Sequence, residues 1–168
     1  MPYLINPYTS VNGALFGMSP QQVEAAAGRA DAQTALTDKQ EVVQETRDGD
    51  ILYYYENNQL ESIDFPNTAE LMFEGAPIPL RTFAEAMQYF ARHDILQRYS
   101  LDGHIGFTLA RRTGIVIYSE RITRLHMGIV ATTSVHRYTV CSMNARDRFV
   151  SRANPRTTPE KNGQPRPV

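Results

Sequence analysis

The sequence predicts an α+β protein with an antiparallel β-sheet and two main helices. Two stretches carry helix-start signals, and each is followed by short segments of alternating apolar and polar residues joined by tight turns. A chain of 168 residues can bury a core of its own. We expect a single domain over residues 1–150, whose helix-plus-strand halves, 1–78 and 79–150, would share one core.

The first helix is predicted to begin at Pro20 and to end at Gly28. Ser19 is a good N-cap residue, proline suits the first helical position, and glycine is a common helix terminator. Residues 3–16, which precede this helix, contain short apolar pieces broken by Pro7 and Gly13. They predict a short strand or an extended arm.

A meander of strands is expected after this helix. Residues 29–40 have no periodicity and predict a loop. Asp48-Gly49 is a strong hairpin signal, and Asn57-Asn58 marks a second turn. Strands are expected at residues 41–47, 51–55, 60–65 and, for a shorter one, 71–74.

The second half is predicted to begin after Gly75–Pro79 with a helix that starts near Thr82. One apolar stripe would face the core from Phe83, Met87 and Phe90, with Ala84 and Ala91 beside it. Further strands are expected at residues 105–109, 114–118, 125–132 and 138–143. The proline-rich residues 151–168 predict a disordered tail.

The charges are distributed unevenly along the chain. Residues 1–80 hold twelve acidic and three basic side chains, a net charge of −9, whereas residues 81–168 hold six acidic and fourteen basic ones, a net charge of +8. Ordinary solvated faces, or attraction between the halves, would explain this pattern. The alternative is that the acidic half faces a basic partner, because such fields steer association.

Acidic residues of the predicted meander surround a run of three tyrosines, Tyr53-Tyr54-Tyr55. Because side chains alternate along a strand, Tyr54 points away from the other two, and at least one tyrosine reaches the outer face. An aromatic anchor within a charged rim is typical of protein-binding surfaces. Tyrosines packed on both sides of the strand are the alternative. The predicted partner interface consists of Asp48, Asp50, Tyr54, Glu56, Glu61 and Asp64.

The sequence contains no motif for a disulfide, a metal site or a phosphate-binding loop. One cysteine, Cys141, cannot close a disulfide within the chain, and neither a Cys-rich zinc site nor a phosphate-binding glycine loop occurs. The four histidines form no metal-binding pair at helical spacing. We therefore expect no cofactor, no metal and no enzymatic activity; an enzyme that uses His104 or Cys141 is the alternative.

Membrane insertion and nucleic-acid binding are also not indicated. No apolar run approaches the roughly 18 residues of a membrane span, and the first residues lack a signal peptide, so we expect a cytoplasmic protein. Arginines with aromatic neighbours in the second half could contact phosphates, but the isoelectric point of about 6.4 argues against nucleic acid. If the acidic face is only a solvated surface, we expect the protein interface around Arg111, Arg112 and Arg124 instead.

Two stretches resemble known families. The Phe16-Gly-Met-Ser-Pro20 sequence, followed by Val23 and Gly28, is similar to the helix opening of the BamE-like fold. The second half, with Phe107 and the apolar run over residues 114–118, resembles small immunity proteins encoded beside polymorphic bacterial toxins. The resemblance covers residues 11–120. Envelope members carry a signal peptide and a lipidated cysteine, and we expect neither here.

These observations together predict a protein that binds another protein. The resemblance implies an immunity protein that neutralises a cognate toxin in the cytoplasm, such as a nuclease, by occluding its active site. A BamE-like structural or assembly module is the alternative. The oligomeric state does not follow from the sequence.

Overall fold

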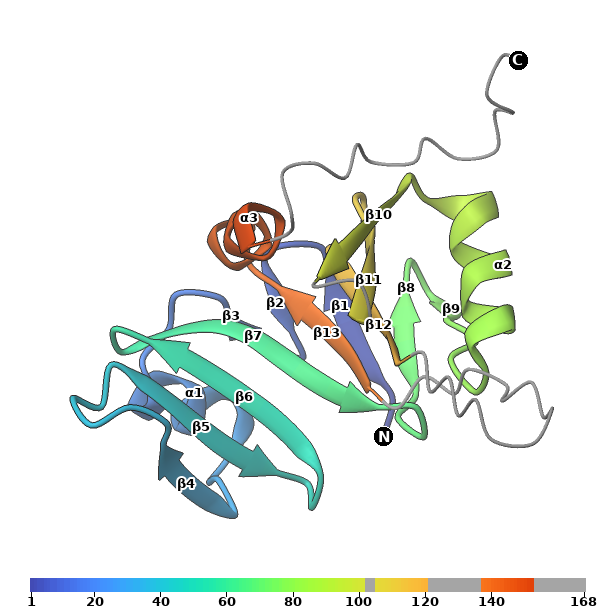
Figure 1. The fold of residues 1–168 in the computed structure, drawn as a ribbon. Coiled ribbons are helices and arrows are strands. Elements are labelled where there is room, and N and C mark those ends of the chain that lie inside the picture. Colours follow the sequence, from blue (N-terminus) through green and yellow to red (C-terminus); the bar gives the residue numbers. More distant parts are fainter. Residues whose placement is uncertain (102–104, 121–136, 153–168) are drawn as a thin grey trace, which may run out of the picture.

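The computed structural model describes residues 1–101, 105–120 and 137–152, and it confirms the α+β class. Within these residues an eight-stranded sheet and a smaller five-stranded sheet are accompanied by helices (Figure 1). One hydrophobic core takes side chains from both sheets and from two helices; among them are Ile5, Val23, Ile63, Phe90 and Ile117.

The eight-stranded sheet is antiparallel throughout and joins the two parts of the chain. At its centre, β7 pairs with β13, so that Ile63 lies opposite Val140. In spatial order, its strands are β10 (Leu96–Leu101), β11 (Ile105–Ala110), β12 (Ile115–Glu120), β13 (Arg137–Cys141), β7 (Gln59–Pro66), β6 (Ile51–Glu56), β5 (Val42–Arg47) and β4 (Ala32–Ala35).

Local turn chemistry fixes the β5–β6–β7 meander, as predicted. Asp48 and Gly49 between β5 and β6 have φ angles of 49° and 82°, and Asn57 and Asn58 between β6 and β7 have 50° and 64°. Two consecutive left-handed residues match the right-handed twist of the flanking strands, and Asp, Asn and Gly tolerate that conformation best. The hairpin register then pairs Tyr54 with Ser62.

The predicted arm over residues 3–16 is three short strands of the smaller sheet. In this sheet β1 runs parallel to β8 and antiparallel to β2. Its strands, in spatial order, are β3 (Ala14–Leu15), β2 (Ser10–Val11), β1 (Tyr3–Asn6), β8 (Leu71–Phe73) and β9 (Ala76–Pro77).

Capping side chains set the starts of the two predicted helices. Helix α1 (Pro20–Ala27) has Ser19 as its N-cap: the Ser19 hydroxyl accepts the Gln22 N–H, and the Gln22 side chain accepts the Ser19 N–H in return. Helix α2 (Phe83–His93) has the same arrangement between Thr82 and Glu85. Both helices therefore begin where the sequence indicates.

The stripe predicted for α2 is only partly correct. Phe90 is fully buried and Met87 packs against the core, but Ala84 and Ala91 are exposed. Ala86 is buried in their place, because it lies four positions before Phe90 and so on the same face of the helix. The side chain of Phe83 lies outside the described residues.

Other differences concern segments whose structure depends on distant partners. Residues 32–35, expected in a loop, form β4, and residues 96–101 form β10, which was not expected. A third helix, α3 (Met143–Arg152), begins where the last strand was expected to end, and it includes the first two residues of the expected tail. The expected strand at 125–132 and the tail from residue 153 onward lie outside the described residues.

Candidate functional site

The alternation of β6 places Tyr54 on the face of the sheet that α1 does not cover. Tyr53 and Tyr55 are buried in the core, whereas Tyr54 is only half-buried, as the sequence predicts. Ser62 on β7 lies opposite Tyr54 and next to Cys141 on β13 in the strand register. This face of β6, β7 and β13 is covered in part by α3 (Figure 1).

A cavity of about 350 Å³ lies between this face and α3, and we call it the β6–β7–α3 cavity. Partly exposed Tyr54 and Glu56 lie at its mouth, and Glu61 and Ser62, each 8% exposed, lie deeper. Its polar lining consists of Tyr54, Glu56, Glu61, Ser62, Asp64, Thr139 and Arg148.

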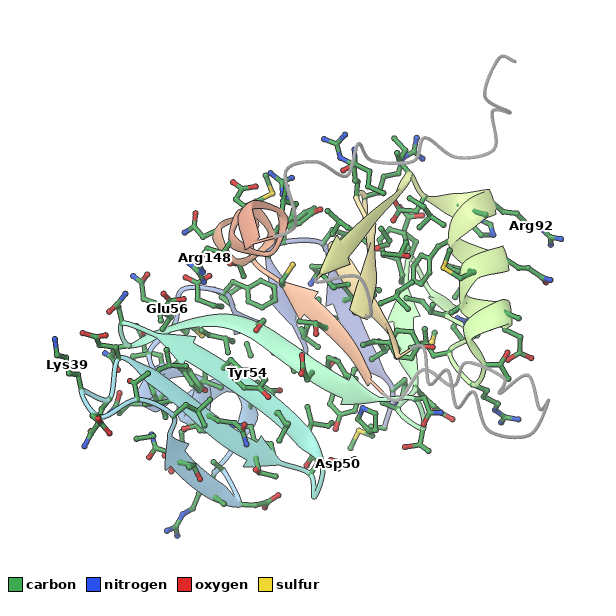
Figure 2. All side chains as sticks on the ribbon, viewed as in Figure 1. Lys39, Asp50, Tyr54, Glu56, Arg92 and Arg148 are labelled. Atoms are coloured by element: carbon green, nitrogen blue, oxygen red, sulfur yellow. The ribbon has the colours of Figure 1, made fainter. Side chains whose placement is uncertain are left out.

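The six residues predicted for the partner interface divide into two groups. Tyr54, Glu56, Glu61 and Asp64 line the β6–β7–α3 cavity, whereas Asp48 and Asp50 lie at the turn before β6 and line a separate cavity. Figure 2 shows Glu56, Tyr54 and Asp50 in sequence along the hairpin, with Arg148 at the Glu56 end. At about 3.3 Å per residue, the two ends of this row are roughly 20 Å apart.

Arg148 of α3 binds two carboxylates of the cavity. Its Nη2 lies 2.9 Å from Oε2 of Glu56 and 3.3 Å from Oε2 of Glu61. The side chains of Arg148 and Glu56 are about one-third exposed, whereas that of Glu61 is 10% exposed. The cavity therefore already accommodates a guanidinium group between its carboxylates.

Glu61 is also the anchor of the third helix. Its carboxylate accepts a hydrogen bond from the Ser142 hydroxyl, and its backbone carbonyl accepts the Ser142 N–H at 2.8 Å. Ser142 Oγ in turn accepts the N–H of Ala145 at 3.0 Å, as an N-cap does. Further along β7, Asp64 Oδ1 accepts a hydrogen bond from the hydroxyl of Thr139 on β13 at 2.5 Å.

Of the two acidic residues at the β5–β6 turn, Asp48 is hydrogen-bonded to the N-terminal strand β1. The hydroxyl of Tyr3 donates to Asp48 Oδ2 at 2.5 Å, and Asp48 and Asp50 remain exposed. Burial, together with this hydrogen bond, raises the pKa of Tyr3 above its usual range. The hydrogen bond therefore joins the β5–β6 turn to β1.

The opposite face of the same strands holds a closed polar network. Glu45 Oε2 accepts hydrogen bonds from Arg47 Nη2 at 2.9 Å and from the Tyr55 hydroxyl at 2.7 Å. Arg47 also donates to the Gly28 carbonyl at the end of α1, and its guanidinium stacks over the Tyr53 ring. These buried groups satisfy one another, so the network fixes α1 on the sheet and offers no site.

Cys141 and His104 are the residues that an enzyme would use in the alternative interpretation. Cys141 is fully buried and its thiol donates to the Gly114 carbonyl at 3.3 Å. Burial raises the pKa of the Cys141 thiol to about 12, whereas a nucleophile requires a thiolate near neutral pH. His104 lies outside the described residues.

Two further findings concern ligands and membranes. Among residues 1–101, 105–120 and 137–152, no group of three His, Cys, Asp or Glu side chains is arranged to hold a metal ion. In the same part of the chain, no helix has the length and apolar character that crossing a membrane would require.

Sequence reasoning missed how Arg148, Ser62 and Thr139 contribute to the cavity. Nothing in the sequence around Arg148 indicates a carboxylate partner in the other half of the chain. Ser142 before an alanine-containing polar run is a weak N-cap signal, and it alone could have indicated α3. The strand partners of Ser62 and Thr139 follow only from the β7–β13 pairing.

No protein-family model, no curated protein and no solved structure matches this chain.

Proposed function

We propose that the chain is a protein-binding inhibitor, and specifically an immunity protein that neutralises a cognate bacterial toxin in the cytoplasm by occluding its active site. The observation that carries this proposal is the row of acidic side chains along the β6–β7 hairpin, with half-buried Tyr54 in its middle. An aromatic group surrounded by charges suits a protein interface.

The chemistry of the row supports a basic counterpart. A groove that holds nucleic-acid phosphates is lined by lysine and arginine, so a nuclease is a toxin class that an acidic plug would fit. Asp48 and Asp50 are exposed at the β5–β6 turn, at one end of the row, and can meet such a groove first. Glu61, by contrast, is buried within the cavity and anchors α3, so it is not among the carboxylates that meet the groove first.

The two competing functions have less support. The stretch that resembles the BamE-like opening is accounted for by the capping of α1, which has physical causes of its own. An enzyme that uses Cys141 would need a thiolate, and burial of this thiol disfavours one.

The test is capture of a partner from the native host with the tagged full-length chain, followed by binding kinetics at two ionic strengths. The Asp48→Lys/Asp50→Lys variant should associate more slowly than the parent, and the difference should be larger at low salt, because exposed charges act mainly on the association rate. The control is Glu24→Lys/Asp38→Lys, which changes the net charge equally at exposed positions on α1 and on the β4–β5 turn.

Equal slowing by both variants would mean that only net charge matters. Unchanged binding by the Asp48→Lys/Asp50→Lys variant would exclude the hairpin as the interface. The contact would then be sought around Arg111 and Arg112, which are exposed on the β11–β12 turn, and around Arg124, which lies outside the described residues.

A further inference from the structure

We infer that the β6–β7–α3 cavity receives the guanidinium group of an arginine side chain from the partner protein. This inference rests on the proposed function, because it names the group that the acidic hairpin would bind. It concerns a pocket, however, and can be tested without the partner.

The first observation is a buried hydroxyl with no protein partner. Ser62 is 8% exposed and lines the cavity, and no group in the described part of the chain forms a hydrogen bond with its hydroxyl. Its strand position opposite Tyr54 directs the side chain to the cavity face. Because buried polar groups are nearly always satisfied, a bound polar ligand would complete this one.

The second observation is the character of the lining. Three carboxylates, those of Glu56, Glu61 and Asp64, face the cavity together with the hydroxyls of Tyr54, Ser62 and Thr139. Carboxylates accept hydrogen bonds and a guanidinium presents five donors and no acceptor, so their chemistry is complementary. A phosphate or an acidic peptide would meet like charge instead.

The third observation is that one guanidinium is already held here. Arg148 Nη2 lies between Glu56 and Glu61, at 2.9 and 3.3 Å from their nearest oxygens. The Arg148–Glu56 pair is about one-third exposed on both sides, and such pairs contribute little to stability, so the Arg148 side chain can share Glu56 with an incoming arginine.

The size and shape of the cavity favour arginine. A volume of about 350 Å³ falls at the lower end of ligand pockets, which suits one long side chain. A planar guanidinium can bind a carboxylate at the mouth and still reach a hydroxyl deeper inside, whereas the ammonium of lysine is a compact point charge. We therefore expect arginine to bind more tightly than lysine.

The experiment is an NMR titration of the full-length ¹⁵N-labelled chain with Nα-acetyl-arginine amide. The amide signals of residues around the cavity should shift and saturate, and the citrulline derivative, which is neutral and nearly isosteric, should leave them unchanged. Ser62→Ala should weaken the binding about tenfold, because it removes one hydrogen bond to a charged donor. Thr68→Ala, at an exposed position outside this cavity, is the control.

A guanidinium group can come from the free amino acid or from an arginine side chain of a protein, and a titration with free arginine distinguishes these two sources. Its α-carboxylate would be repelled by Glu56 and Glu61, so the blocked derivative should bind more tightly if the site is made for a protein side chain. Tighter binding of free arginine would overturn that assignment. Equal binding of the citrulline derivative, or an unchanged affinity in a folded Ser62→Ala variant, would overturn the guanidinium pocket itself.

The two proposals can fail separately. If binding of a captured partner depends on Asp48 and Asp50 but this chain does not bind the arginine derivative, the proposed function is kept and the pocket is excluded. If the arginine derivative binds specifically and the Asp48→Lys/Asp50→Lys variant associates with its partner as fast as the parent does, the pocket is kept and the acidic turn is excluded as the interface.

Discussion

Ser142 and Glu61, 81 positions apart in the chain, are joined by a side-chain hydrogen bond that fixes the third helix on the eight-stranded sheet. The Ser142 hydroxyl donates to the carboxylate and at the same time accepts the Ala145 N–H. A residue predicted as part of a partner interface is therefore also part of the scaffold that shapes the cavity.

The first prediction compares the two carboxylates that bind Arg148. Glu61→Ala should lower the free energy of unfolding by about 2–3 kcal/mol, because the buried Ser142 hydroxyl and the guanidinium both lose a charged partner. Glu56→Ala should cost less than about 1 kcal/mol, because this ion pair is partly exposed. Urea denaturation measures both values, and equal losses would contradict the anchoring role of Glu61.

The meander illustrates what local sequence could predict. Asp48-Gly49 and Asn57-Asn58 specify tight turns by their own backbone preferences, and the alternation over Tyr53–Tyr55 specifies which side faces the core. The start of α1 was equally predictable from Ser19 and Pro20. In these elements the cause of the structure lies within a few residues.

The missed elements depend on partners far along the chain. Residues 32–35 have the sequence Ala-Gln-Thr-Ala, with little preference for a strand, and β4 forms because it pairs with β5 at the edge of the sheet. Helix α3 lacks a strong cap box and is placed by Glu61. The cavity combines β6, β7, β13 and α3. Tyr54, Glu56, Glu61 and Asp64, which the sequence predicts for a partner interface, line it together with Arg148, whose place there depends on a helix that the sequence did not predict.

The second prediction concerns Asp94 at the end of α2. Its carboxylate accepts the backbone N–H groups of Arg112 and Thr113 at 2.7 and 2.9 Å, and the Thr113 hydroxyl at 2.9 Å. Asp94→Ala should cost about 2–3 kcal/mol in denaturation, because the buried Thr113 N–H and hydroxyl and the part-buried Arg112 N–H lose a charged acceptor. Asp147→Ala, at a side chain 65% exposed, should change the midpoint little; similar losses in both would exclude a specific role for Asp94.

The third prediction uses two glycines with similar backbone angles. Gly114 has a φ angle of 71°, and a Cβ there would lie 2.9 Å from Cε1 of Tyr8, whereas Gly49 at 82° has open space around it. Gly49→Ala should cost about 1–2 kcal/mol from backbone strain alone. Gly114→Ala should cost about 1–3 kcal/mol more from the steric clash.

A double-mutant cycle isolates that clash. If the Tyr8 ring causes the extra loss, Tyr8→Ala should reduce the effect of Gly114→Ala to near that of Gly49→Ala. Additive losses in the double variant would show that the ring is not responsible. The removal of Tyr8 also breaks its hydrogen bond to the Arg111 carbonyl, so the Tyr8→Ala single variant is the reference.

The last prediction concerns the buried thiol of Cys141 and its pH dependence. Burial raises the pKa of this thiol from 9.0 to about 12, so the folded state holds the proton more tightly than the unfolded state does. The resulting stabilisation is fully present below pH 9 and is lost as pH rises from 9 to 12, by up to about 1.4 kcal/mol per pH unit. Urea denaturation at pH 8, 9 and 10 should therefore give a steeper decline for the parent than for Cys141→Ala, whose other ionisable groups are the same. Parallel declines in the two proteins would mean that the thiol ionises as readily in the folded state as in the unfolded one, which would contradict the effect of burial on its pKa.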